Sequence, residues 1–266
     1  MMQSRRMFLA ATAASVAALP LQSMAEEREF SPFTVSDKAL QNAHEKFYPN
    51  GHVAPYPGNT VICHMPAQSR FLEDISAIAE QLHHVSFRDK LGILPPASYH
   101  MTVFPGANDP GKAHSSWPKD LPLSASIDAC TKLVRSRFEK EKLTTKAPFR
   151  VRLDPEKTLQ YASRAATLRM VGADAEAEIA LRTTRDQLSR VYNHRDPDHD
   201  QYGFHITLAY TLRALTVEEQ KEYREILSRS MTRILARTPV LELGLPEFCT
   251  FPDMSVFSPE CFLRAE

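Results

Sequence analysis

Apolar residues recur along this chain at two different spacings. Between Arg70 and His84 they lie three to four positions apart, which predicts an amphipathic helix. Thr216 precedes a similar stretch and is followed three positions later by Glu219, a pair typical of a helix start. Helices are therefore expected near Asp37–Phe47 and over Arg70–His84, Ser126–Leu143, Asp174–Tyr192 and Thr216–Arg237.

Alternation of apolar and polar residues indicates strands. Phe149–Leu153 alternates as expected of a strand with one buried face. Prolines interrupt the apolar clusters from Val240 to Phe262, so short strands and turns are expected there. Further strands are expected at Asn59–Cys63 and Ala166–Val171.

Two more expected strands carry the same motif, 105 positions apart. Each copy consists of an aromatic residue, a histidine, an apolar residue, a threonine and a second apolar residue. Residues i and i+2 of a strand point to the same face, so each strand has an apolar face and a face with an imidazole beside a hydroxyl. The copies are Tyr99-His100-Met101-Thr102-Val103 and Phe204-His205-Ile206-Thr207-Leu208.

The order strand, helix and motif strand occurs twice, which predicts an α+β fold with two pseudo-symmetric lobes. Each lobe is expected to be a mainly antiparallel sheet with helices on its outer face. The two motif strands would then lie side by side in a central cleft. We assign this domain to residues 59–266 and expect residues 26–58, which contain several proline breakers, to form an irregular N-terminal arm.

The first 25 residues have the composition of an export signal. The pair Arg5-Arg6 precedes an Ala-rich apolar run, and Ser23-Met24-Ala25 provides the small residues that a signal peptidase reads. Paired arginines are typical of twin-arginine export. We therefore expect a periplasmic protein that has no stable membrane association once residues 1–25 are removed.

Charge and composition narrow the class of partner. The chain is 43% apolar and 24% charged, as is usual for globular proteins. Its formal charge is 0, and loss of the two arginines in residues 1–25 leaves −2. A nearly neutral protein has no general attraction to long nucleic acid. We expect a monomer that acts on a small-molecule or short oligonucleotide substrate.

The four cysteines, Cys63, Cys130, Cys249 and Cys261, lack the C-x-x-C spacing of a metal site. An exported protein can form disulfides, and Cys249 and Cys261 are the nearest pair. Four buried thiols are the simpler interpretation.

The paired motifs resemble those of the 2H phosphoesterase superfamily, whose members carry one His-x-Thr or His-x-Ser motif on each of two lobes. His100–Val103 matches the first motif and His205–Leu208 the second, within a resemblance that spans residues 59–262. Relatives include RNA 2′,3′-cyclic phosphodiesterases, and the motifs are also similar to a less characterised bacterial and fungal branch. The resemblance implies a hydrolase that acts on a cyclic or nucleotide-like phosphodiester.

Opening such a phosphodiester requires a base that deprotonates water and an acid that protonates the leaving sugar oxygen. Histidine suits both tasks, because its ordinary pKa of about 6.5 allows either protonation state near neutral pH. Threonine hydroxyls can donate hydrogen bonds to the phosphate oxygens, where charge builds up. This chemistry requires no metal or other cofactor. The expected catalytic residues are His100, His205, Thr102 and Thr207.

Three other residues are weaker candidates for substrate binding. Arg169 lies in an otherwise apolar strand and could meet a phosphate. Trp117 and Tyr210 could stack on a base. Regular alternation turns Tyr210 away from the face that carries histidine and threonine, unless a bulge intervenes.

Two other functions fit the sequence. His194 and His199 lie in an Asp-rich loop, Asn193–Gln201, which could bind a divalent metal together with His205. The protein would then be a metal-dependent periplasmic hydrolase. The second alternative is a protein that binds nucleotides without turnover.

Overall fold

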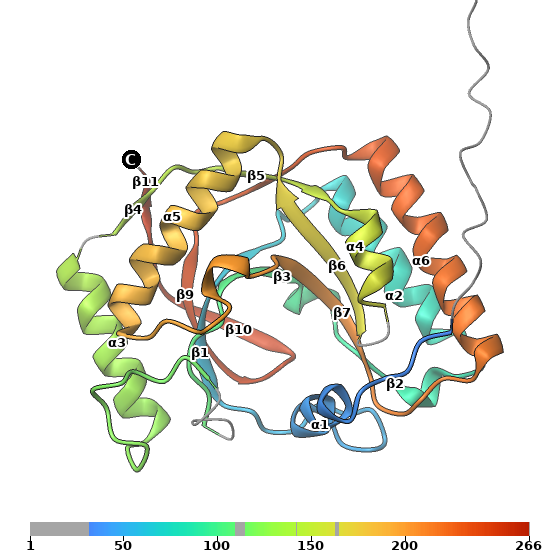
Figure 1. The fold of residues 1–266 in the computed structure, drawn as a ribbon, viewed down its shortest axis with the longest axis horizontal. Helices are drawn as coiled ribbons and strands as arrows, with labels where there is room; N and C mark the ends of the chain where they lie inside the picture. Colours follow the sequence, from blue (N-terminus) through green and yellow to red (C-terminus); the bar gives the residue numbers. More distant parts are fainter. Residues whose placement is uncertain (1–31, 110–114, 142, 163–164, 266) are drawn as a thin grey trace, which may run out of the picture. The chain divides into compact units, whose positions relative to one another are not determined.

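A curled antiparallel sheet runs through the middle of the fold (Figure 1). The computed structural model describes residues 32–109, 115–141, 143–162 and 165–265. Within these ranges the sheet has nine strands. Their order is β10 (Val256–Phe262), β9 (Glu247–Asp253), β1 (Gly58–His64), β3 (His100–Phe104), β7 (His205–Thr211), β6 (Ala165–Gly172), β5 (Phe149–Leu153) and β8 (Leu241–Leu243), and β2 (Leu91–Ile93) also pairs with β7. The expected export signal lies outside the described residues.

The predicted helices all form. They are α1 (Asp37–Lys46), α2 (Arg70–His83), α3 (Ile127–Glu141), α5 (Ala175–Tyr192) and α6 (Val217–Arg237). The predicted start of α6 is confirmed, because Thr216 and Glu219 cap each other's backbone N–H groups. The pattern did not reveal α4 (Pro155–Gln160), a single short helix that Asp154 caps. None of the helices in the described ranges is both long and apolar enough to cross a membrane.

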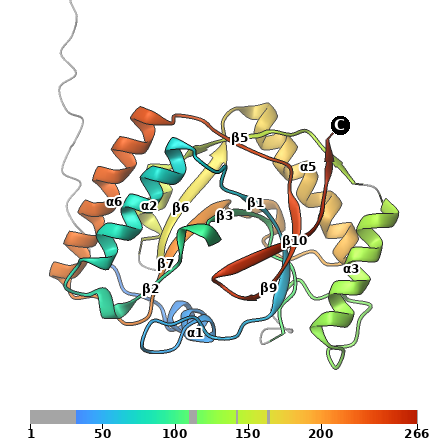
Figure 2. The same ribbon diagram turned by 180° about the vertical axis from the view of Figure 1, so that it is seen from behind.

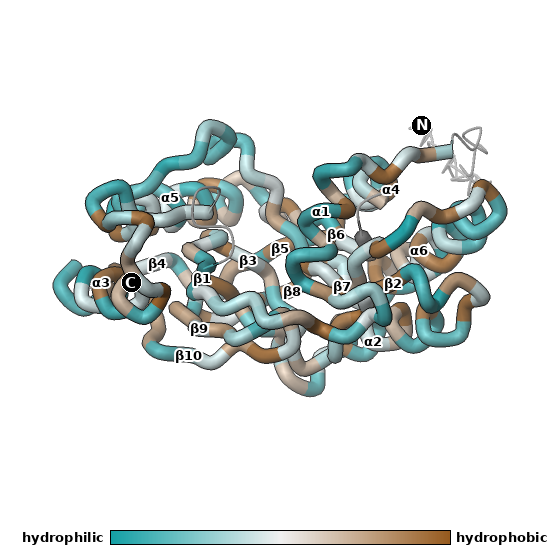
Figure 3. Tube along the Cα trace, turned by 90° about the horizontal axis from the view of Figure 1, so that it is seen from below, coloured by the Kyte–Doolittle hydropathy of each residue, from teal (hydrophilic) through white to brown (hydrophobic). Residues whose placement is uncertain are grey.

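Two pairs of helices flank the sheet (Figure 1 and Figure 2). Helix α2 packs on α6, and α3 packs on α5. Along α3, α5 and α6 the colouring alternates between hydrophilic and hydrophobic in Figure 3, as expected of helices with one buried side. A small parallel pair, β4 (Thr144–Thr145) with β11 (Arg264–Ala265), completes the described strands.

The α+β class is confirmed, whereas the division into two lobes is not. The strands of both halves of the chain join in one sheet, in which β3 and β7 are antiparallel neighbours. The helices also mix, because α2 from the first half packs on α6 from the second, and α3 packs on α5 in the same way. The repeated order of elements therefore does not correspond to two separate bodies.

The four cysteines are free thiols. Cys63, Cys130 and Cys249 are buried, and Cys261 is half-buried. The structure therefore agrees with the interpretation of the cysteines as thiols, and Cys249 and Cys261 do not form a disulfide.

The contact between β3 and β7 rests on Met101, which lies opposite Ile206 and is fully buried. Replacing Met101 by alanine is expected to lower the free energy of unfolding by about 2–5 kcal/mol, because a cavity opens beneath the two strands. Met101→Leu, which conserves the volume, should cost less than about 1.5 kcal/mol. Urea unfolding measures both values, and equal costs for the two variants would contradict this role.

Candidate active site

The pairing of β3 with β7 brings the two motifs together. Met101 lies directly opposite Ile206, and both side chains are buried in the core. Neighbours of an antiparallel pair face each other in reverse order, so each histidine lies across from the threonine of the other motif. All four residues are half-buried and share the face turned away from the core. The structure therefore unites the predicted set, His100, Thr102, His205 and Thr207.

The two imidazoles are held in the same way. The Nδ1 of His100 donates to the carbonyl of Ser98 over 2.7 Å, and the Nδ1 of His205 donates to the carbonyl of Gly203 over 2.9 Å. A carbonyl can only accept, so each Nδ1 carries the proton. The Nε2 of each ring is then the basic nitrogen. In both motifs, therefore, the carbonyl two residues before the histidine fixes the orientation of the imidazole ring.

Burial lowers the pKa of both histidines. The pKa of His100 falls to about 4, with smaller contributions from His64 and His205. The pKa of His205 also falls to about 4, and the positive charges of Arg169 and Lys46 add to the effect of burial. In the empty site both rings are therefore neutral at pH 7. A bound anion would favour the protonated form of the nearer ring and so provide an acid.

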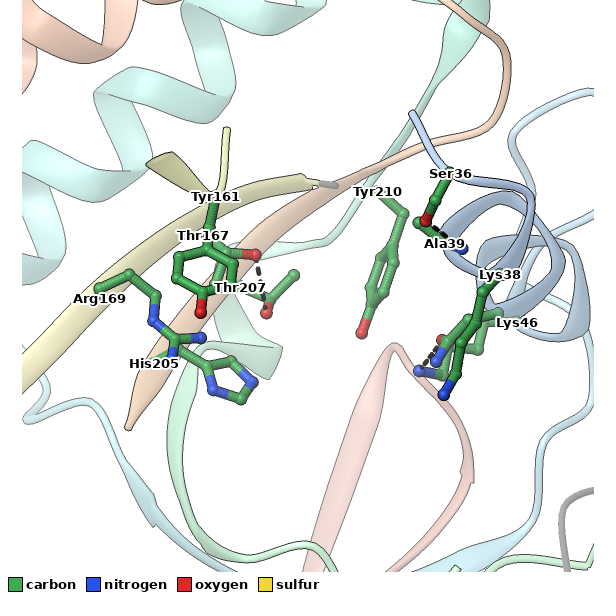
Figure 4. Close-up of a pocket in the computed structure, with 11 residues that line it drawn as sticks. Ser36, Lys38, Ala39, Lys46, Tyr161, Thr167, Arg169, His205, Thr207 and Tyr210 are labelled. Atoms are coloured by element: carbon green, nitrogen blue, oxygen red, sulfur yellow. Dashed lines mark hydrogen bonds between the residues drawn. The ribbon is translucent and has the colours of Figure 1, made fainter. Parts of the chain in front are cut away.

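The motif residues line two cavities that share part of their wall. We call the larger one, of about 330 Å³, the basic cavity, and the smaller one, of about 280 Å³, the aromatic cavity. Both are lined by Lys46, His205, Thr207 and Tyr210. The basic cavity adds Lys38, Asn42, Tyr161, Thr167 and Arg169, and the aromatic cavity adds His100, Thr102, Tyr56, Tyr202, Phe251, Met254 and Phe257, among others. Figure 4 shows the basic cavity, with Lys38 and Lys46 on one side and Arg169 and His205 on the other.

Tyr210 reaches the cavities because β7 contains a bulge. Ala209 pairs with Ala166 of β6, but the next pair of the ladder is Thr207 with Thr167, so two steps on β7 oppose one on β6. The extra residue reverses the alternation beyond Thr207. Tyr210 therefore shares the face of His205 and stands in the middle of the basic cavity (Figure 4).

Arg169 lies across from His205 on the neighbouring strand β6. Its backbone is fixed by the unpredicted helix α4, since its N–H donates to the Thr158 hydroxyl over 2.9 Å. Its guanidinium lies 4.5 Å from the centre of the Tyr161 ring. A Cβ at Gly203 would come within 1.6 Å of the guanidinium, so a side chain there would displace the guanidinium from this position. The sequence-based suggestion that Arg169 could meet a phosphate thus agrees with its place beside His205.

Trp117 does not line either cavity. Its ring is buried in the core, and its Nε1 donates to the carbonyl of Leu121 over 3.1 Å. Its own carbonyl accepts a hydrogen bond from the Nδ1 of His194 over 2.9 Å. Trp117 therefore packs in the core and helps to hold the loop that contains His194, and it does not line either cavity beside the motif histidines.

Sequence reasoning missed the wall that the N-terminal arm contributes. Helix α1 supplies Lys38, Asn42 and Lys46 to the basic cavity, and the residue Tyr56 further along the arm lines the aromatic cavity. The spacing of four between Lys38, Asn42 and Lys46 places them on one face of a helix. A helix was expected in this segment, so the row of polar residues on one of its faces could have indicated that α1 lines a site.

The two histidines of the loop considered for metal binding lie beside aspartates. The Nε2 of His194 lies 3.0 Å from Asp196, and the Nε2 of His199 lies 3.0 Å from Asp186. Within the described ranges, two groups of side chains are close enough to hold a metal ion, and neither contains His205. They are Asp186 with His199 and Asp200, and His64 with Glu247 and Cys249.

Comparisons with known proteins agree with the motif. A family model described as "2H-phosphodiest: Domain of unknown function (DUF1868)" matches residues 46–160, which include the first motif. No curated protein matches the chain. The crystal structure of a conserved protein of unknown function, ATU0111 from Agrobacterium tumefaciens str. C58, is 30% identical, with a TM-score of 0.73, over 82% of this chain and 90% of that one.

A second solved structure, TT0787 of Thermus thermophilus, is more distant. It is 18% identical over 79% of this chain and 99% of that chain, with a TM-score of 0.33. At that TM-score the similarity adds nothing to the fold. The family model and the paired His-x-Thr strands agree, and the chain belongs to the 2H phosphoesterase superfamily.

Proposed function

We propose that the protein hydrolyses a cyclic or nucleotide-like phosphodiester by two-histidine acid–base catalysis without a metal ion. Membership of the superfamily supports a phosphoesterase-type activity. The observation that carries the finer proposal is the mirrored geometry of His100 and His205, each with its Nδ1 bonded to the carbonyl two residues upstream. Both basic nitrogens are thereby free for proton transfer at one phosphate.

In this reaction the Nε2 of one histidine removes a proton from water as its oxygen forms a bond to phosphorus. The bond between phosphorus and the leaving sugar oxygen breaks, and the Nε2 of the other histidine, protonated, gives its proton to that oxygen. The product is a phosphate monoester with a free hydroxyl. The histidine that began as base ends protonated, and exchange with water restores the starting state. Proton transfers of this kind contribute about 10²–10⁴-fold to the rate.

In this proposal, the negative charge on the phosphate oxygens is stabilised by groups on the same face as the histidines. Thr102 and Thr207 offer hydroxyl donors beside the histidines, and Arg169 lies next to His205. Hydrogen-bond donors aimed at the oxygens where charge develops are among the strongest contributors to catalysis. The phosphate in turn favours a protonated imidazole, which the empty site lacks at neutral pH.

The aromatic cavity suits a flat ring on the substrate. The Phe257 ring lies 4.2 Å from the His100 ring, between centroids, and 5.1 Å from the Phe251 ring. Bases stack on aromatic surfaces without requiring a particular sequence. At about 280 Å³ the cavity matches a small molecule or the end of a short oligonucleotide. Export, as expected from the first 25 residues, would place the reaction in the periplasm.

Loss of either histidine is the first test. His100→Ala and His205→Ala are each expected to lower kcat for an adenosine 2′,3′-cyclic phosphate by about 10²–10⁴-fold, because an acid or a base is lost. Product release is followed by chromatography, and circular dichroism confirms that both variants fold. Wild-type turnover in either variant would exclude the proposal. Loss of wild-type activity in EDTA, restored by a divalent ion, would select the metal-dependent hydrolase, and tight binding of the wild type without product would select the binding protein.

The threonines are tested by a matched pair of variants. Thr207→Val keeps the shape of the side chain and removes its hydroxyl, so kcat should fall by about 10²–10³-fold, as for loss of one donor to a developing oxyanion. Thr207→Ser keeps the hydroxyl and should retain most of the activity. Retained activity in Thr207→Val together with a loss in Thr207→Ser would show that the methyl group, and not the hydrogen bond, is what matters.

The histidines should titrate at unusually low pH. By NMR of the imidazole signals, the pKa of His100 and of His205 is expected near 4 in the free protein. Because these values lie below the ordinary pKa of about 6.5, stability should decline as the pH falls from about 6.5 to 4. Adenosine 2′-monophosphate should raise at least one of the two pKa values by a unit or more. Two unshifted pKa values in the saturated complex would contradict a phosphate between the rings.

A further inference from the structure

Helix α1 is fixed against the catalytic strands, although it belongs to the arm before the sheet. The His44 Nε2 donates to the carbonyl of Leu212, just beyond β7, over 2.8 Å. Phe47, directly after the helix, is buried against the Tyr210 ring with centroids 5.4 Å apart. The Phe47 ring also lies on Gly92 of β2, where a Cβ would come within 2.6 Å of it. These contacts hold α1 in a fixed position as one wall of the cleft.

The side chains that α1 turns toward the cleft are basic or polar. Lys46 donates to Asn42 over 2.5 Å, and its Nζ lies 5.0 Å from the centre of the Tyr210 ring. Lys38 is exposed at the rim and makes no ion pair with any residue in the described ranges. On the opposite side of the cavity stands Arg169 (Figure 4). No aspartate or glutamate is among the described residues that line this cavity.

The basic cavity is lined by three positively charged side chains, those of Lys38, Lys46 and Arg169, which is more than a single phosphodiester would neutralise. That group carries one negative charge, and the proposed reaction places it between His100 and His205. All four motif residues line the aromatic cavity, and His205 and Thr207 also line the basic cavity. Lys38 lines the basic cavity and not the aromatic cavity, and it lies across the basic cavity from Arg169 (Figure 4). Positively charged side chains around a cavity beyond the reacting group favour the binding of anionic ligands there.

We propose that the basic cavity binds a second anionic group of the substrate, a phosphate monoester. This inference rests on the proposed function and specifies its substrate class: a nucleoside cyclic phosphate that carries a further phosphate. The ring lies in the aromatic cavity, the cyclic phosphodiester lies between His100 and His205, and the second phosphate lies between α1 and Arg169. Helix α1 is then the element that selects for doubly phosphorylated substrates.

The binding test uses product-like ligands, so that it does not depend on turnover. Calorimetry compares adenosine 2′-monophosphate with adenosine 2′,5′-bisphosphate, and adenosine 3′-monophosphate with adenosine 3′,5′-bisphosphate, at low salt. In the wild type at least one bisphosphate is expected to bind about tenfold more tightly than its monophosphate. In Lys38→Gln this ratio should fall toward one. In Lys140→Gln, which removes an exposed charge on α3, the ratio should stay as in the wild type.

The kinetic test compares adenosine 2′,3′-cyclic phosphate with the same compound carrying a 5′-phosphate. The ratio of the two kcat/KM values should favour the phosphorylated substrate in the wild type and fall in Lys38→Gln. Cleavage of both substrates, with equal kcat/KM and equal product affinities, would overturn the second phosphate site and leave the proposed function standing. Cleavage of neither substrate would reject the proposed function, and the calorimetric ratios would then decide the anion site by themselves.

Discussion

The antiparallel register between β3 and β7 is the constraint on which this site depends. Buried Met101 lies opposite buried Ile206, and this apolar pair fixes which residues of the two strands meet. A slip of one residue in either strand would turn the histidine of that strand into the core and its buried apolar residue into the cleft. The chemistry is therefore held in place by side chains that take no part in it. The packing of the apolar face therefore determines the geometry of the polar face.

The motif residues could be predicted because their signal is local and repeated. Strand alternation placed His100 with Thr102 and His205 with Thr207, and the cap of α6 followed from Thr216 and Glu219. The single sheet was not predicted, since the repeated order of elements does not say which strands pair or which helices pack together. The course of β7 beyond Thr207 depends on a bulge that is defined by its pairing with β6. Tyr210 therefore could be placed only conditionally.

Non-local packing explains the remaining differences. Trp117 and Tyr210 are both aromatic residues near the motifs, and composition alone cannot separate a core ring from a ring that lines a cleft. The Trp117 Nε1 finds its acceptor in the carbonyl of Leu121 and the ring is buried. The sequence predicts a helix near Asp37–Phe47 in the irregular arm but does not predict where that helix docks, because α1 is held by a hydrogen bond between residues 168 positions apart. Such contacts leave no periodic signal.

The docking of α1 also determines at what point during synthesis the complete cleft can form. The helix is among the first elements made, but the carbonyl that receives His44 belongs to Leu212, 168 positions later. Contacts of such long range form only after the chain between them has been ordered, and they slow folding. During synthesis the Leu212 carbonyl and the Tyr210 ring, which α1 and Phe47 contact, are absent until β7 has emerged, which is also when the second histidine becomes available. The wall and the catalytic pair are therefore completed together, and shorter nascent chains contain neither.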